Sequence, residues 1–197
     1  MNKKMLLSSL ALSLGLVSAG SGAFAASPAF GVEGVKSVAV SAPGKEGPAT
    51  INNLTVKSVI PLLVHAKKLY TYTSSGGVTF QPETFQYKGT EYRYLSSDIG
   101  SKQQLMNYVK RAYTHNAAAF YVQTQFLEQN GRMAQVNTDI GNSMQYDKAT
   151  ARMVSKTATA AVFELSVPDQ GTNQSVVVKL KKVSGYWRID MSPDTLF

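Results

Sequence analysis

The chain has 197 residues, of which 44% are hydrophobic, with a formal net charge of +8 and no cysteine. This length and composition fit one globular domain. The missing cysteine excludes disulfides, thiolate nucleophiles and cysteine-based metal sites. The basic charge predicts weak attraction to polyanions, and we find no motif typical of nucleic-acid binding.

The first 25 residues have the layout of a secretory signal. Asn2, Lys3 and Lys4 open the chain, an apolar run follows at residues 5–17, and Ala23-Phe24-Ala25 forms a small-x-small cleavage site. The run is shorter than the roughly 20 apolar residues that span a bilayer. The competing interpretation is a buried N-terminal helix. We expect a protein that is secreted, extracellular or associated with the cell wall, without a transmembrane anchor.

Closely spaced glycines and prolines in residues 26–50 predict a flexible N-terminal arm, so the domain is expected to cover residues 51–197. Thr55 is a good N-cap, and Leu54 with Val59 forms a hydrophobic staple for a helix that ends near Ser74. Pro61 lies within that pattern and predicts either a kink or a later start, near Ile60.

Two further helices and several strands follow in the predicted order. Alternating aromatic residues around Lys88-Gly89 predict a hairpin over residues 84–95. Ser101 and Gln104 form a capping box, and Thr114 caps a short additional helical turn. Asn130-Gly131 predicts a hairpin between strands at residues 121–128 and 132–136.

Alternating apolar residues predict three more strands, at residues 157–167, 175–183 and 186–191. The order of elements predicts an α+β fold in which N-terminal helices pack on a curved antiparallel sheet. We expect a single cone-like domain of the nuclear-transport-factor-like or cystatin-like plan, with a protruding loop.

The sequence offers little catalytic chemistry. Its two histidines, His65 and His115, have no metal-ligand spacing and no serine-nucleophile motif beside them. We therefore expect no cofactor, no metal and no enzymatic activity. A pair of carboxylates brought together by folding stays open as an alternative, and so does a ligand-binding cone fold with a deep cavity.

The segment from residue 137 to residue 150 is the strongest candidate for a binding loop. Loops longer than about 12 residues are often functional. This one combines acidic and apolar side chains, and the competing interpretation is a mobile polar connection. The predicted partner-binding residues are Asp139, Ile140, Gly141, Asn142, Ser143, Met144, Tyr146 and Asp147.

A set of motifs in this order resembles one known family, the secreted IseA-like inhibitors of DL-endopeptidases from Gram-positive bacteria. The resemblance runs from about Leu54 to Met191. It rests on Phe85-x-Tyr87-x-Gly89-x-x-Tyr92-x-Tyr94-Leu95, Ser97-Asp98-Ile99-Gly100, Gln129-Asn130-Gly131-Arg132, Asp139-Ile140-Gly141-Asn142-Ser143 and Gly185-Tyr186-Trp187-Arg188-Ile189.

This resemblance implies a proteinaceous inhibitor of papain-like cell-wall cysteine hydrolases, which cut peptidoglycan stem peptides next to D-glutamate. It implies that a loop enters the active-site cleft of the target and so restrains autolysis and cell separation. We assign that loop to residues 137–150, with Asp98 as a secondary candidate on a neighbouring loop. Asp139 is expected to imitate a stem-peptide carboxylate, with Met144 and Tyr146 filling adjacent apolar surface. The protein is expected to be a monomer.

The main alternative is a non-catalytic module that binds anionic wall polymers through its basic side chains. Such a contact predicts salt-sensitive retention on purified walls and no effect on hydrolase rate. It is compatible with inhibition, because one chain can carry both surfaces.

Overall fold

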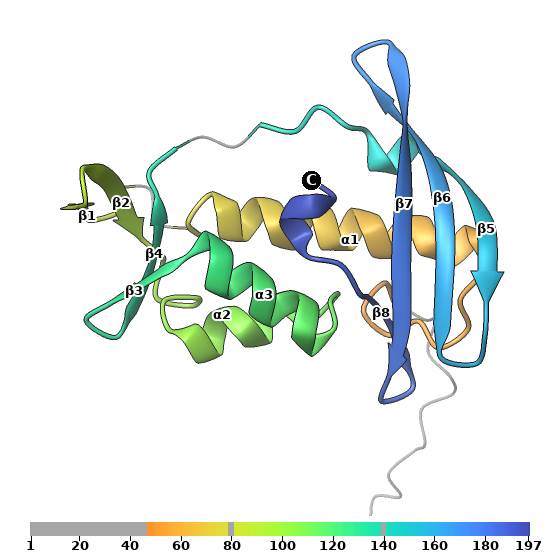
Figure 1. Cartoon of the computed structure of the whole chain (residues 1–197), viewed down its shortest axis with the longest axis horizontal. Helices are drawn as coiled ribbons and strands as arrows, with labels where there is room; N and C mark the ends of the chain where they lie inside the picture. Colours follow the sequence, from red (N-terminus) through yellow and green to blue (C-terminus); the bar gives the residue numbers. More distant parts are fainter. Residues whose placement is uncertain (1–46, 79–80, 139–140) are drawn as a thin grey trace, which may run out of the picture. The chain divides into compact units, whose positions relative to one another are not determined.

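The structure is a computed structural model that describes residues 47–78, 81–138 and 141–197 (Figure 1). The predicted signal segment and residues 26–46 of the predicted arm lie outside the described residues. Residues 47–50 form a turn in which the Thr50 amide donates to the Gly47 carbonyl at 2.9 Å. The described residues belong to one compact unit, Ser41–Phe197. None of the described helices is both long and apolar enough to cross a membrane.

Helix α1 covers Val56–Ser74 and begins where its capping residues predict. The Thr55 hydroxyl accepts from the Ser58 amide at 3.2 Å, and the Ser58 hydroxyl accepts from the Thr55 amide at 2.8 Å. This reciprocal pair satisfies two backbone donors that a helix start leaves open. Pro61 lies inside the helix, so the later start near Ile60 is wrong.

Helices α2, Lys102–Val109, and α3, His115–Gln125, start at the predicted caps, Ser101 and Thr114. The predicted strand over residues 121–128 is wrong, because the helix capped by Thr114 continues to Gln125. Tyr121 and Val122 are buried from within that helix. Only the end of the predicted segment is extended, as the short strand β3, Leu127–Gln129.

The first sheet has the order β1-β2-β4-β3 and is antiparallel throughout. It contains β1, Thr84–Tyr87, β2, Thr90–Tyr94, and β4, Arg132–Val136, beside β3. Both of its hairpins turn through two residues with positive φ, Lys88-Gly89 and Asn130-Gly131. These pairs confirm the predicted turns, since tight hairpins favour the left-handed backbone.

The second sheet has the order β5-β6-β7-β8 and is also antiparallel. Its strands are β5, Thr150–Lys156, β6, Ala160–Asp169, β7, Thr172–Val183, and β8, Tyr186–Ile189. Strand β5 was not predicted. The α+β class is confirmed, and the strands divide between two four-stranded sheets. Two short 3-10 turns, η1, Tyr146–Lys148, and η2, Pro193–Thr195, complete the element order.

The core joins one face of α1 to the inward face of the second sheet. From α1 it takes residues at helical spacing, and from the sheet it takes alternate positions. The principal contributors are Val59, Leu62, Leu63, Ala66, Leu69, Phe163, Leu165, Val178, Leu180, Trp187 and Ile189. The Trp187 indole also donates to the Asn52 carbonyl at 3.1 Å, which satisfies its buried N–H. Thr157 and Thr159, at the start of the strand predicted over residues 157–167, are exposed and precede β6.

The C-terminal end of α1 is joined to the loop after β2 by a contact that requires glycine. Gly77 has a φ of +88°, and a Cβ added there would lie 1.8 Å from the Ser96 hydroxyl oxygen and 2.9 Å from the Ser96 Cβ. The Ser96 amide donates to the Gly76 carbonyl at 2.8 Å in the same contact. Residues 96–100 are therefore fixed against the end of α1.

We predict that Gly77→Ala destabilises the protein by about 2–4 kcal/mol, because it adds a steric overlap to the cost of a positive φ. Gly89→Ala is the matched control, since Gly89 also has a positive φ, +80°, but nothing lies within 4 Å of its added Cβ. The free energy of unfolding of that variant should fall by only about 1 kcal/mol. Chemical denaturation measures both, and equal losses would contradict the contact.

Candidate functional site

The predicted binding segment, residues 137–150, connects β4 of the first sheet to β5 of the second (Figure 1). Its start stays attached to the first sheet. The Asn137 amide donates to the Glu91 carbonyl at 2.9 Å, and its side chain donates to the Glu91 carboxylate at 2.6 Å. Two of the predicted residues, Asp139 and Ile140, lie outside the described residues.

Lys67 of α1 holds the middle of this segment. Its ammonium group donates to the Met144 carbonyl at 2.5 Å and to the backbone and side-chain oxygens of Asn142 at 3.3 and 3.2 Å. The Asn142 side chain also accepts from the Met144 amide at 3.0 Å, which fixes the turn between them. Burial lowers the pKa of Lys67, while the nearby charges of Asp147 and Asp169 act in the opposite direction. One lysine thus satisfies three oxygen acceptors of the segment.

The turn between β6 and β7 holds the same segment from another side. The Ser143 hydroxyl donates to the Asp169 carboxylate at 2.5 Å and accepts from the Gln170 side chain at 3.2 Å. The Gln145 amide donates to the Pro168 carbonyl at 2.8 Å. Residues 142–145 are therefore ordered by contacts to two separate elements, and the description as a mobile connection does not fit them.

Tyr146 is in the core, with 1% of its surface exposed. Its hydroxyl donates to the Leu196 carbonyl, and its ring packs edge-on against Phe197 with the centroids 4.9 Å apart. Burial raises the pKa of Tyr146 to about 12. The expectation that this side chain fills a partner's surface therefore does not fit the structure. Its role is to anchor the end of the segment.

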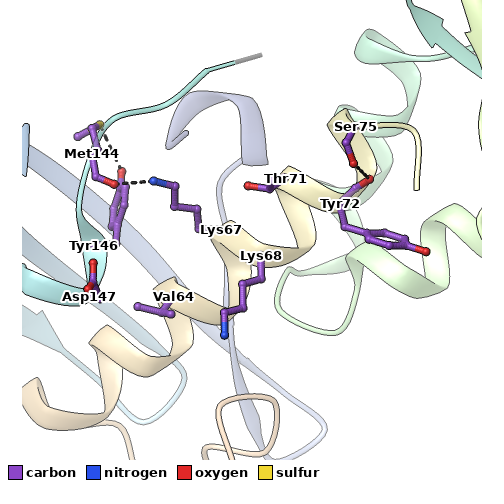
Figure 2. Close-up of a pocket in the computed structure, with 9 residues that line it drawn as sticks. All are labelled: Val64, Lys67, Lys68, Thr71, Tyr72, Ser75, Met144, Tyr146 and Asp147. Atoms are coloured by element: carbon purple, nitrogen blue, oxygen red, sulfur yellow. Dashed lines mark hydrogen bonds between the residues drawn. The ribbon is translucent and has the colours of Figure 1, made fainter. Parts of the chain in front are cut away.

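A groove of about 650 Å³ lies between this segment and the exposed face of α1 (Figure 2). Met144, Tyr146 and Asp147 line one side of it. Met144 is half-buried and Asp147 is exposed, so these two can contact a ligand or partner. The groove is lined on the other side by Val64, Lys67, Lys68, Thr71 and Tyr72 of α1 and by its C-cap residue Ser75.

The secondary candidate, Asp98, is exposed and held in place by two hydroxyl donors. Tyr72 of α1 donates to one carboxylate oxygen at 2.6 Å, and Ser96 donates to the other at 2.5 Å. These hydrogen bonds, that of Ser96 first, lower the pKa of Asp98. The side chain is therefore an ionised, oriented carboxylate at the surface.

Tyr72 links the Asp98 carboxylate to the groove, because it lines the groove and donates to Asp98. Its ring packs on Tyr108 of α2 with the centroids 5.0 Å apart. Sequence reasoning assigned neither Lys67 nor Tyr72 to the site. Both residues lie on the polar stripe of α1, which the sequence shows as surface. Their roles could not be predicted, because the groups they bind, Met144 and Asp98, are distant in sequence.

The described residues contain no group of three or more metal-binding side chains. His115 is exposed at the start of α3, and the enclosed Nε2 of His65 has no hydrogen-bond partner in the described part of the chain. The arrangement offers charged and apolar binding surface.

Comparison with known proteins identifies the family. The chain is 25% identical to the uncharacterized protein YoeB of Bacillus subtilis (strain 168) over 150 residues, which is 72% of this chain and 83% of that protein. Residues 50–194 match the family described as IseA DL-endopeptidase inhibitor. The match covers nearly all of the described fold, including both sheets and the Asp98 loop. This chain therefore belongs to the IseA DL-endopeptidase inhibitor family.

Proposed function

We propose that this protein is secreted and inhibits papain-like DL-endopeptidases of the cell wall by placing the loop around Asp98, together with residues 137–150, against the active-site cleft. Membership of the inhibitor family supports the general role. The observation that carries the specific mechanism is the exposed Asp98 carboxylate, fixed by Tyr72 and Ser96.

Asp98 suits the imitation of a substrate anion. The target enzymes, as the family resemblance implies, act next to D-glutamate, so their clefts must accommodate a carboxylate. A carboxylate that is already oriented in the free inhibitor has less conformational freedom to lose on binding. The hydrogen bonds that lower the pKa of Asp98 favour its ionised form.

Residues 141–147 supply the second part of the proposed contact surface. Met144 offers apolar surface and Asp147 an exposed carboxylate beside the groove. The role of Asp139 and Ile140 stays a prediction. Together the two loops border the same stripe of α1, so one partner can contact both.

The proposed function is inhibition without bond chemistry. Three side-chain donors hold the two loops in place: Lys67 donates to the Met144 carbonyl, and Tyr72 and Ser96 donate to the Asp98 carboxylate. Tyr72, Ser96 and Lys67 each orient a surface segment. Blocking a hydrolase in this way would restrain autolysis and cell separation.

The direct test is inhibition of a DL-endopeptidase that digests purified peptidoglycan. Titration with the protein should remove activity in proportion to the inhibitor added. We predict that Asp98→Asn raises the inhibition constant about tenfold to a hundredfold, because it removes one charge-assisted contact worth about 1.5–3 kcal/mol. The substitution keeps the size and acceptor oxygen of the side chain.

Asp190→Asn is the matched control for Asp98→Asn. Asp190 is also exposed and accepts from a hydroxyl, that of Thr114 at 2.7 Å, but it follows β8 and lies outside the proposed surface. The Asp190→Asn variant should inhibit the endopeptidase as strongly as the parent protein does. Unchanged inhibition by Asp98→Asn would refute the role of Asp98. If Asp139→Asn alone were impaired, the contact would belong to residues 137–150.

A second prediction concerns Lys67, which positions residues 142–144. Lys67→Met keeps an unbranched side chain only one atom shorter and removes the donor to three oxygens. We expect amide exchange at residues 142–145 to become at least tenfold faster, with a stability loss of about 1 kcal/mol. Hydrogen exchange measured residue by residue checks this.

Lys57→Met provides the control, because Lys57 is an exposed lysine in the first turn of the same helix. It should leave exchange in residues 142–145 as in the parent. Equal protection of this segment in Lys67→Met and the parent would show that the contacts to Asp169, Gln170 and Pro168 suffice.

A further inference from the structure

Two basic residues face each other on the outward side of the second sheet. Lys181 of β7 and Arg188 of β8 are directly opposite in the antiparallel register. Their neighbours Leu180, Trp187 and Ile189 are buried on the inward side, so Lys181 and Arg188 share the outward face. Like charges directly opposite each other destabilise a sheet. The pair therefore concentrates positive charge on the outward face at this point of the sheet.

Arg111 is brought to the same edge of the sheet by backbone hydrogen bonds. The Ile189 amide donates to the Ala112 carbonyl and the Thr114 amide donates to the Ile189 carbonyl, both at 2.9 Å. Arg111 directly precedes Ala112, and Arg188 directly precedes Ile189, so both arginines lie beside this backbone pairing. The Arg111 guanidinium packs 4.6 Å from the ring centroid of Tyr108, which keeps it beside α1 and α2.

The surroundings of His65 give independent support for this concentration of positive charge. Burial is the largest cause that lowers the pKa of His65, followed by the charges of Arg111, Lys68 and Arg188. Lys68 lies one helical turn after His65. The positive field of all three residues thus reaches the same partly buried imidazole.

Few carboxylates oppose this charge. Within the described ranges, the ion pairs shorter than 4 Å join Arg132 to Glu83 and Arg152 to Glu164. Asp190 follows β8, and its carboxylate accepts from the Thr114 hydroxyl. The described carboxylates therefore leave all four basic side chains without an ion pair at this distance.

We propose that Lys68, Arg111, Lys181 and Arg188, here called the basic edge, form a binding site for a phosphodiester polyanion. Four cations contributed by different elements suit a chain of repeated charges better than a single ion. Two of them are guanidinium groups, whose paired donors match the two non-ester oxygens of a phosphodiester. Bound phosphates would also relieve the repulsion between Lys181 and Arg188.

This site contains neither Asp98 nor residues 137–150, so Lys181 and Arg188 can be changed without altering the loops proposed to inhibit. Lys68 lines the groove as well, so the two surfaces adjoin along α1. A polymer on the basic edge would concentrate the inhibitor where that polymer occurs. The partner differs from the hydrolase in chemical class.

The test is titration of the isotope-labelled protein with a glycerol phosphate oligomer, inorganic phosphate and poly-L-glutamate of matched charge. The oligomer should bind, with perturbed NMR signals around the basic edge and an affinity that falls as salt increases. It should also raise the pKa of His65, because it neutralises the positive field. Inorganic phosphate should bind at least tenfold more weakly. Equal affinity for poly-L-glutamate would overturn the assignment to phosphodiesters.

The variants Arg188→Gln and Lys181→Glu sharpen the test. Each should weaken oligomer binding at least tenfold, while Lys57→Gln and Lys57→Glu, which make the matched one-unit and two-unit charge changes elsewhere on the exposed surface, should bind like the parent. Lys181→Glu should in addition raise the melting temperature by roughly 1–4 °C, since it replaces a repulsive pair by an attractive one. Loss of binding thus cannot be attributed to misfolding. The proposal is wrong if both variants bind the oligomer like the parent.

Discussion

Burial of one face of α1 is the constraint on which the rest of the structure depends. Val59, Leu62, Leu63, Ala66 and Leu69 enter the core, and helical geometry then exposes the opposite stripe of the same helix. That stripe carries Lys67, which holds residues 142–144, and Tyr72, which orients Asp98. The packing of a single helix thus fixes the positions of both candidate loops.

The elements that could be predicted from sequence are those determined by local chemistry. The caps of all three helices and the two glycine-containing hairpins of the first sheet follow from side chains within four residues of each other. The strand predicted at residues 121–128 failed because an apolar run does not separate a buried helix from a strand. Strand β5 was missed because its outward positions are mostly polar and its inward ones are only half-buried.

The candidate site shows the same division between local and distant contacts. The length and polarity of residues 137–150 correctly marked an unusual connection, but its anchoring was invisible in the sequence. Lys67 lies more than 70 residues from the oxygens it binds, and Tyr146 reaches a carbonyl 50 residues away. Only the fold could show that Tyr146 is part of the core while Asp98 is oriented at the surface.

Acidic and basic side chains both border α1. Asp98 lies at the C-terminal end, Tyr72 and Tyr108 stack beside it, and Arg111 packs on Tyr108 towards the basic edge. Asp98 offers a carboxylate suited to a hydrolase cleft, and the basic edge offers cations suited to an anionic polymer. Complementary charge contributes to both the rate and the specificity of association.

The central claim is that a hydrolase cleft receives the Asp98 loop and the segment held by Lys67. The most direct measurement is an NMR titration of the labelled protein with a DL-endopeptidase whose catalytic cysteine is replaced by alanine. We predict broadened or shifted amide signals at residues 96–100 and 141–147 and unperturbed signals at β7 and β8. Perturbation confined to β7 and β8, with residues 96–100 and 141–147 unchanged, would contradict the account.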